Sequence, residues 1–278
     1  MGRKRLGVAL SGGGARGFVH IGVLQALEAA GVRVDFFAGT SVGALIGAAY
    51  AAGVPLGDIL AFASSPLVRP TALWRWMDLS IPRTGLIQGH QVEQWLGEIL
   101  GEKTFADLQV PLTVVAVDLN SGKEAHLTKG RLTTAVRASM AVPGIFAPVE
   151  MQGMRLVDGG LLNNVPVDVV RQMGADVVVG VDVTSDNEAS FWRSLAQKRL
   201  LATTVGGVLV TLSDALGVVM RAHTLERLQR YPPNFLLRPP IPSSITAASA
   251  YDHAEELISL GKKAAETMLP ALQAQIRG

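Results

Sequence analysis

The sequence predicts an α/β fold, with a mostly parallel central sheet and helices on both faces, arranged in three layers. Short apolar runs alternate with segments of helical periodicity along the 278 residues, and such alternation favours a parallel sheet. The apolar run Val177–Val181 is rich in β-branched residues, as in strands that are buried on both faces. Hydrophobic residues make up 49% of the chain but aromatic residues only 5%, so small aliphatic side chains would let helices pack closely on the sheet.

Each predicted element has its own signal in the chain. Short apolar runs predict strands at Leu6–Leu10, Val34–Ala38, Leu112–Val117, Met154–Val157 and Val177–Val181. Small or apolar residues at helical spacing predict helices at Gly17–Ala30, Val42–Ala52, Thr133–Met140 and Glu255–Met268. Gly31 and Gly53 follow two of these helices as stop signals. Asn164 is expected to cap a further helix with Pro166 in its first turn.

We expect a single catalytic domain over residues 1–278, with an apolar helical cap or interface segment at about 190–230. Leu200–Met220 is the most apolar part of that segment, and its 21 residues are long enough to span a bilayer. Three glycines and Asp214 within it weaken that interpretation. They favour a helical hairpin that is buried or docked on a surface.

Composition excludes several classes of function. The 25 basic residues nearly balance the 23 acidic ones, whereas a nucleic-acid-binding protein needs a concentrated basic face. The chain has no cysteine, which excludes disulfides, a cysteine nucleophile and cysteine-ligated metals. The basic N-terminus is followed by an apolar run, Leu6–Leu10, that is too short for the core of a signal peptide. A cytoplasmic location is therefore expected.

The pentapeptide Gly39-Thr40-Ser41-Val42-Gly43 fits the G-x-S-x-G pattern of a nucleophile elbow. In that motif a serine lies on a tight turn between a strand and a helix, and the flanking glycines avoid collisions with both. The predicted strand before Ser41 and the predicted helix after it supply this context. The positive end of the helix would favour a developing alkoxide. The plainer alternative is a Gly-rich turn in which Ser41 only caps the helix.

A second Gly-rich segment follows the first predicted strand. Gly12, Gly13 and Gly14 would let backbone N–H groups converge on an anion or a developing oxyanion. Arg16 would brace this loop or add positive potential. If the first two strands are neighbours, the loop and Ser41 should open at the same edge of the sheet. A plain turn between strand and helix is again the simpler alternative.

The same glycines permit a competing interpretation as a dinucleotide site. Gly12, Gly14 and Gly17 satisfy G-x-G-x-x-G, and Asp35 follows at a suitable distance. However, the acid that binds the ribose should end the second strand, and Asp35 lies within or at the start of that strand. A dinucleotide-dependent oxidoreductase is therefore the weaker hypothesis.

A serine nucleophile needs a group that accepts its proton. None of the five histidines, His20, His90, His126, His223 and His253, follows a clear strand. His20 is expected to pack within a helix, and His253 has the position in the chain that a Ser–Asp–His triad would give its histidine. A carboxylate could act instead: Asp158 ends a predicted strand, and two glycines after it would permit a sharp turn. On this pattern alone, Asp158 ranks only slightly above Asp118 and Asp182.

Four segments together resemble the patatin-like phospholipase family, in order and spacing, from residue 4 to about 183. They are Gly12–Gly17, Gly39–Gly43, Ser139–Pro148 with its Pro143 and Phe146, and Asp158-Gly159-Gly160. The similarity is greatest to short bacterial members that consist of little but the catalytic domain, and Tyr251–Ala265 resembles their closing helix.

The resemblance implies a Ser–Asp dyad in which Ser41 is the nucleophile and Asp158 the general base. It implies an oxyanion hole at Gly12, Gly13 and Gly14, with Arg16 holding the loop, and supporting roles for the glycines of the elbow and turn, Gly39, Gly43, Gly159 and Gly160. The implied reaction is hydrolysis of a fatty-acyl ester through an acyl-enzyme, without a metal or another cofactor. Phospholipase A, lysophospholipase and general carboxylesterase activity all remain open.

An enzyme of this kind would have to reach acyl esters held in lipid. Trp74 and Trp76, with Arg69 and Arg75, have the composition of an anchor at a membrane interface, although ordinary packing is the commoner role of such residues. Leu200–Met220 could line the path of the acyl chain or form a homodimer contact. We therefore expect a lipid or acyl-ester substrate, with peripheral membrane contact or a homodimer as open alternatives. A non-catalytic membrane-docking protein with the same fold is a further hypothesis.

Overall fold

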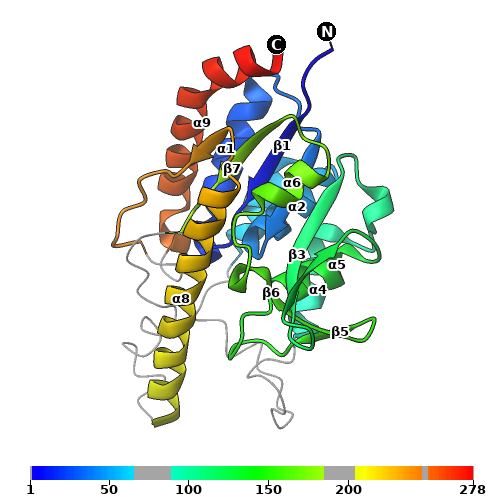
Figure 1. Cartoon of the computed structure of the whole chain (residues 1–278), viewed down its shortest axis with the longest axis vertical. Helices are drawn as coiled ribbons and strands as arrows, with labels where there is room; N and C mark the ends of the chain where they lie inside the picture. The colour runs from blue at the N-terminus through cyan, green and yellow to red at the C-terminus, as the bar shows by residue number, and fades with distance from the viewer. Residues whose placement is uncertain (1, 66–88, 185–203, 246–249, 278) are drawn as a thin grey trace.

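The computed structural model describes residues 2–65, 89–184, 204–245 and 250–277. These residues form a sheet of eight strands in the order β5-β6-β3-β2-β1-β7-β8, with β4 paired to β3 (Figure 1). The strands are β1 (Leu6–Leu10), β2 (Phe36–Thr40), β3 (Leu112–Asp118), β4 (Lys123–Leu127), β5 (Val149–Met151), β6 (Met154–Asp158), β7 (Val177–Val181) and β8 (Phe235–Leu237). The helices are α1 (Phe18–Ala29), α2 (Val42–Ala51), α3 (Leu56–Ala63), α4 (His90–Leu100), α5 (Leu132–Ser139), α6 (Val167–Gln172), α8 (Thr204–Arg230) and α9 (Ala254–Arg277).

The sheet is parallel at its centre and antiparallel on one side. β1 pairs in parallel with β2 and β7, and the parallel pairing continues to β3 and β8. β3 then pairs antiparallel with β4 and β6, and β6 with β5. The predicted α/β class is thus confirmed, and the antiparallel strands make the sheet mixed.

Helices cover both faces of the sheet, and β1 shows how its residues are shared between them. Leu6, Val8 and Leu10 point into the larger core, which also holds apolar side chains of α1 to α5 and α9. Ala9 points to the other face, where it joins buried residues of α6 and Leu228 of α8. Because successive side chains of a strand point to opposite faces, a central strand between two helical layers must be apolar throughout. All five residues of β1 are buried.

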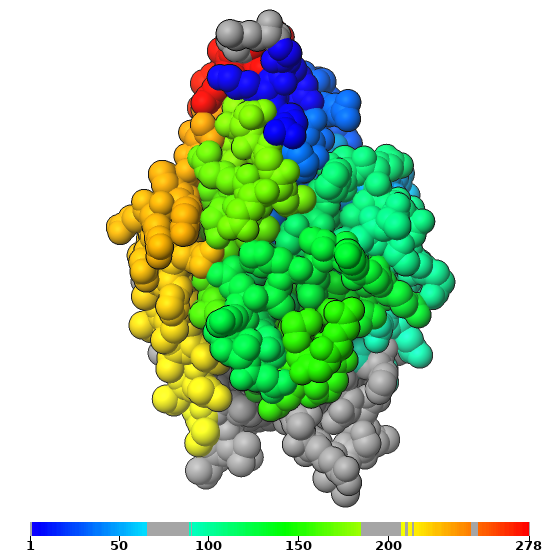
Figure 2. Space-filling model, turned by 45° about the vertical axis from the view of Figure 1, so that its right-hand side comes forward, coloured from blue at the N-terminus to red at the C-terminus, as the bar shows by residue number. Residues whose placement is uncertain are grey.

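The segment predicted as a helical hairpin is one continuous helix from Thr204 onward, so that prediction was wrong. α8 runs for 27 residues and has no proline to interrupt it. A glycine inside a helix costs only about 1 kcal/mol, which packing at the far end of α8 offsets. There Arg227 forms ion pairs with Glu124 of β4 and Asp168 of α6. Figure 2 shows α8, in yellow and orange, along one edge of the body.

Among the other elements, β4, β5, β8, α3 and α4 were not predicted, and those that were predicted differ mainly at their ends. β2 begins and ends two residues later than expected, and α9 continues to Arg277. Asn164 does not cap a helix, because Pro166 is the N-cap of α6 and Val167 its first residue. The proposed anchor residues from Arg69 to Trp76 lie outside the described residues. Within the described part of the chain, no helix has the length and apolar character needed to cross a bilayer.

α1 and α9 cross closely because each has a glycine at the crossing point. A Cβ atom on Gly22 would lie 2.0 Å from the carbonyl oxygen of Ile258, and one on Gly261 would lie 2.1 Å from that of Val19. Both distances are far shorter than any van der Waals contact, so neither position has room for a side chain. The C-terminal helix is therefore seated on α1 by direct contact between backbones.

We expect Gly261→Ala to destabilise the protein by about 1–3 kcal/mol, because a methyl group there would force α9 away from α1. Gly97→Ala is a matched control: Gly97 lies within α4, and nothing approaches its Cβ position within 4 Å. That variant should be neutral or gain up to about 1 kcal/mol from helix propensity. Urea unfolding of both variants measures the difference. Equal stability of the two would contradict the close crossing.

Candidate active site

Ser41 lies on the turn between β2 and α2, as the elbow motif predicts. Its backbone has φ 53° and ψ −123°, a conformation that a residue with a side chain rarely adopts. The backbone N–H of Ser41 donates to Oγ of Ser139, at 2.8 Å. The Ser139 hydroxyl in turn donates to the carbonyl oxygen of Val115 in β3, at 2.6 Å. A strained turn persists only where its surroundings hold it, and this pair of bonds holds the peptide of Ser41 against the sheet.

Gly39 and Gly43 lie where the turn is most crowded. A Cβ atom on Gly39 would lie 2.6 Å from the carbonyl oxygen of Gly43, and one on Gly43 would lie 2.3 Å from that of Leu10. α2 can therefore begin directly behind β2 and against the end of β1 only because both residues lack a side chain. This contact fixes the direction in which α2 leaves the sheet.

Asp158 is a buried carboxylate beside Ser41. The backbone N–H of Gly160 donates to its Oδ1, at 2.8 Å, and the Ser41 side chain is close enough to the carboxylate to favour its charged form. Burial raises the pKa of Asp158 to about 6, because the charged form loses its hydration, and the contacts with Gly160 and Ser41 oppose this rise. The carboxylate is thus a stronger base than an exposed aspartate, yet it remains ionised at neutral pH.

The register of three neighbouring strands brings these two residues together. Thr40 of β2 lies opposite Val115 of β3, and Ala116, the next residue of β3, lies opposite Asp158 of β6. β6 is antiparallel to β3, so Asp158 is near Ser41 only because β6 enters from the carboxyl edge and ends after five residues. Asp158 thus ends a strand, as predicted, but that strand is an antiparallel one in a sheet that was expected to be mostly parallel.

Gly159 and Gly160 let the chain turn directly after Asp158. A Cβ atom on Gly159 would lie 2.3 Å from the carbonyl oxygen of Val115, and one on Gly160 would lie 2.5 Å from Cε of Met220 in α8. The turn after the carboxylate is therefore pressed between β3 and α8.

The alternative bases have other partners in the structure. Asp118 accepts hydrogen bonds from Asn120, Ser121 and Arg155, which stabilise the turn after β3. The carboxylate of Asp182 accepts from Thr184 and from Arg238. Of the histidines with described contacts, His126 pairs with Glu124 and His253 with Glu256, while the buried His20 bonds to the backbone of Ser11. Of these three carboxylates, Asp158 is the one whose pKa the Ser41 side chain affects.

The Gly-rich loop lies beside the serine turn, because β1 and β2 are parallel neighbours. A Cβ atom on Gly12 would come within 3.2 Å of the Cβ atom of Ser41. Gly13 has φ 155° and Gly14 has φ 59°, and both values favour glycine. The described hydrogen bonds give the backbone N–H of Gly12 a partner, Oδ1 of Asn164 at 3.1 Å.

Arg16 points away from the serine turn and into the protein. Only 1% of its surface is exposed, and its Nε–H donates to the carbonyl oxygen of Ile245, at 3.2 Å. Arg16 thus ties the Gly-rich loop to the segment that precedes α9. This contact agrees with the bracing role expected for Arg16.

The residues of the dinucleotide hypothesis do not come together. Asp35 accepts a hydrogen bond from the backbone N–H of Leu6 and pairs with Arg3. Leu6 begins β1, whereas the Gly-rich loop follows the end of β1. The acid and the glycines therefore lie at opposite edges of the sheet, and no ribose could contact both.

Two further residues of the site were missed by the sequence analysis. Ser139 belonged to a recognised motif but had no assigned role, and it holds the backbone of the nucleophile candidate. Asn164 was expected to cap a helix, and it bonds instead to Gly12, 152 residues earlier in the chain. No local pattern signals either contact, because each depends on segments that meet only in the folded protein.

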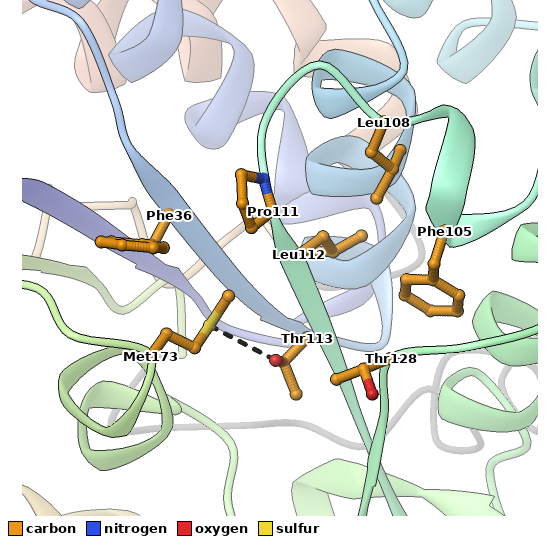
Figure 3. Close-up of a pocket in the computed structure, with 8 residues that line it drawn as sticks. All are labelled: Phe36, Phe105, Leu108, Pro111, Leu112, Thr113, Thr128 and Met173. Atoms are coloured by element: carbon orange, nitrogen blue, oxygen red, sulfur yellow. Dashed lines mark hydrogen bonds between the residues drawn. The ribbon is translucent and has the colours of Figure 1, made fainter.

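A separate pocket of about 390 Å³ opens at the other edge of the sheet (Figure 3). Phe36 at the start of β2 and Leu112 at the start of β3 are among its lining residues, with Met173 and Thr113 across from them. Ser41 follows the far end of β2, so this pocket is not part of the candidate active site.

Comparisons with known proteins point to one family. The patatin-like phospholipase family matches residues 8–171. A lysophospholipase nte1 of Aspergillus fumigatus is 30% identical over 250 residues, covering 86% of this chain and 16% of that protein. An uncharacterized NTE family protein of Mycobacterium bovis is 38% identical over 179 residues, covering 64% of this chain and 49% of that protein. The chain thus spans less than half the length of either relative.

Among solved structures, human GIVD cytosolic phospholipase A2, in complex with methyl γ-linolenyl fluorophosphonate, has the same fold. Its TM-score is 0.50 at 16% identity, and the alignment covers 99% of this chain and 59% of that one. The family match runs from Val8 within β1 to beyond β6 and takes in the Gly-rich loop, Ser41 and Asp158. This chain therefore belongs to the patatin-like phospholipase family.

Proposed function

We propose that this protein is a serine acyl-ester hydrolase that acts on lipids through a Ser41–Asp158 dyad and an acyl-enzyme. The observation that carries the proposal is the position of Ser41, on a strained turn, beside a buried carboxylate whose pKa is raised to about 6. A general base works best when its pKa lies near the working pH, because it is then both ionised and able to hold a proton. Family membership makes a lipid ester the favoured substrate.

In the proposed mechanism, Asp158 accepts the proton of the Ser41 hydroxyl while Oγ attacks the acyl carbonyl carbon. The carbonyl oxygen becomes an oxyanion, which backbone N–H groups of the Gly12–Gly14 loop stabilise. Asp158 then gives its proton to the departing alcohol, and an acyl-Ser41 ester remains. A water molecule attacks this ester, Asp158 takes the proton of the water, and the fatty acid leaves as Ser41 regains its hydrogen.

We propose that α8 brings this site to a lipid surface. Five of its apolar side chains, Val208, Leu212, Val218, Val219 and Leu225, are between 37% and 71% exposed. From Thr204 to Met220 the helix has one charged residue, Asp214. Met220 of the same helix lies against the turn of Asp158, so α8 links the apolar stripe to the site. Burying valine and leucine side chains in lipid would favour binding.

We expect Ser41→Ala and Asp158→Asn each to lower kcat for a soluble nitrophenyl ester by about 10²–10⁴-fold, since one removes the nucleophile and the other its base. A fluorophosphonate should label the wild-type protein once, at Ser41. Ser64→Ala, at an exposed position in the chain, is the control and should retain full activity. Undiminished turnover by the Ser41→Ala protein would refute the proposal, and lipid binding without any ester hydrolysis would favour a non-catalytic docking protein.

The pH dependence of kcat/KM should show one ionisation near pH 6. Only the carboxylate form of Asp158 can accept a proton, so activity should fall about tenfold per pH unit below that value and level off above it. Asp118→Asn alters the carboxylate at the end of neighbouring β3 and should leave this profile unchanged. Circular dichroism at each pH confirms that the protein stays folded. A profile flat down to pH 4.5 would exclude Asp158 as the base.

A variant with Val208→Glu and Val218→Glu should bind phosphatidylcholine vesicles at least tenfold more weakly, because two charges would have to enter the apolar layer. Its hydrolysis of a soluble ester should be unchanged. Gln229→Glu adds one negative charge at an exposed polar position of α8 and should not alter binding. If the double variant instead turns a dimer into a monomer in analytical ultracentrifugation and still binds vesicles, the stripe is a homodimer contact.

A further inference from the structure

The peptide bond between Ser11 and Gly12 is held at both of its polar ends. The carbonyl oxygen of Ser11 lies 2.8 Å from Nε2 of His20. The backbone N–H of Gly12 donates to Oδ1 of Asn164 at 3.1 Å. A trans peptide is planar, so its C=O and N–H groups point in opposite directions and rotate together. Two partners on opposite sides therefore stop this peptide from rotating.

The surroundings of His20 are compatible with only one tautomer of its ring. Its side chain is fully buried, and burial lowers its pKa to about 4, so the ring is neutral at neutral pH. A carbonyl oxygen can only accept a hydrogen bond, so Nε2 must hold the ring proton. Nδ1 then has only a lone pair, and no hydrogen-bond partner is described for it. Among the contacts that the structure describes, the His20 ring therefore makes one hydrogen bond, which it donates to the carbonyl oxygen of Ser11.

Ser11 is also fixed at its other polar atoms. Its backbone N–H donates to the carbonyl oxygen of Val181, at 3.1 Å. Its Oγ accepts a hydrogen bond from the backbone N–H of Val183, at 3.0 Å. The start of the Gly-rich loop is thereby attached to the end of β7, to α1 through His20, and to the Asp158 turn through Asn164.

Asn164 lies between the Gly-rich loop and the turn of the proposed base. Its Oδ1 would be 2.7 Å from a Cβ atom on Gly12 and 3.0 Å from one on Gly160. Gly160 is the residue whose N–H binds the Asp158 carboxylate. One buried amide therefore sets the distance between the loop and the carboxylate.

We propose that His20 and Asn164 are positioning residues that hold the Ser11–Gly12 peptide in one orientation and so fix the direction in which the rest of the Gly-rich loop presents its N–H groups to the oxyanion. This inference rests on the proposed hydrolase activity and adds two residues that support its oxyanion hole. The N–H of Gly12 is already used by Asn164. The described residues include no hydrogen-bond partner for the N–H of Gly13, which is free to meet a substrate oxygen.

The effect of His20 variants on kcat tests whether His20 holds the Ser11–Gly12 peptide in place. His20→Leu removes the donor, and His20→Gln retains an N–H near the position of Nε2. With a soluble nitrophenyl ester we expect His20→Leu to lower kcat 10–100-fold with KM within twofold of wild type, and to slow fluorophosphonate labelling of Ser41 by a similar factor. His20→Gln should stay within about threefold of wild type. Val23→Ala is the control for packing: Val23 is buried one turn further along α1, and its variant should lower the melting temperature without changing kcat.

The rate of amide hydrogen exchange at Gly12 measures how firmly the Ser11–Gly12 peptide is held, and it does not depend on enzyme activity. In protein labelled with ¹⁵N-glycine, the Gly12 amide should exchange slowly in the wild type and in His20→Gln, and at least tenfold faster in His20→Leu and Asn164→Leu. Unchanged exchange in both leucine variants would overturn the proposal, as would equal kcat values for His20→Leu and His20→Gln. If Gly12 is protected as expected but the wild-type protein neither hydrolyses esters nor reacts with the fluorophosphonate, the peptide is held as proposed and the hydrolase assignment fails.

Discussion

The tightest constraint on this structure is that the Ser41 side chain lies beside the desolvated Asp158 carboxylate. A buried carboxylate keeps its charge near neutral pH only where other groups compensate for lost water, and here the N–H of Gly160 and the Ser41 side chain do so. Both must stay close to the carboxylate. The registers of β2, β3 and β6 therefore have to be maintained together, because a slip of one residue would turn Asp158 to the other face of the sheet.

The elements around this contact each restrain it from a different direction. Ser139 holds the strained backbone of Ser41, and the glycines of the elbow let α2 approach the sheet. On the far side, α8 presses Met220 against the turn after Asp158 and is itself anchored by the ion pairs of Arg227. The strained backbone of Ser41 is thus held in place by the central sheet, in which every residue of β1 and β7 is buried.

Local signals in the sequence were enough to predict most strands and helices and to place Ser41 on a turn between a strand and a helix, because an elbow is built from adjacent residues. Asp158 was favoured over other carboxylates by resemblance, and nothing local says that the strand before it, β6, is antiparallel. Contacts between distant segments could not be predicted. Asn164 and Gly12 are 152 residues apart, and the helix expected at Asn164 begins only at Val167. The glycines of Leu200–Met220 suggested a break in the helix, because the sequence does not show the tertiary packing that keeps α8 continuous.

Burial of Asp158 also affects the free energy of unfolding of the protein. In the unfolded chain this carboxyl group ionises near pH 3.8, whereas in the folded protein it does so near 6. Between these values the folded form holds a proton that the unfolded form has released, so the free energy of unfolding falls as the pH rises, by roughly 3 kcal/mol in total. The ionised form of Asp158 that the proposed mechanism needs is therefore the form in which this group contributes less to the stability of the fold.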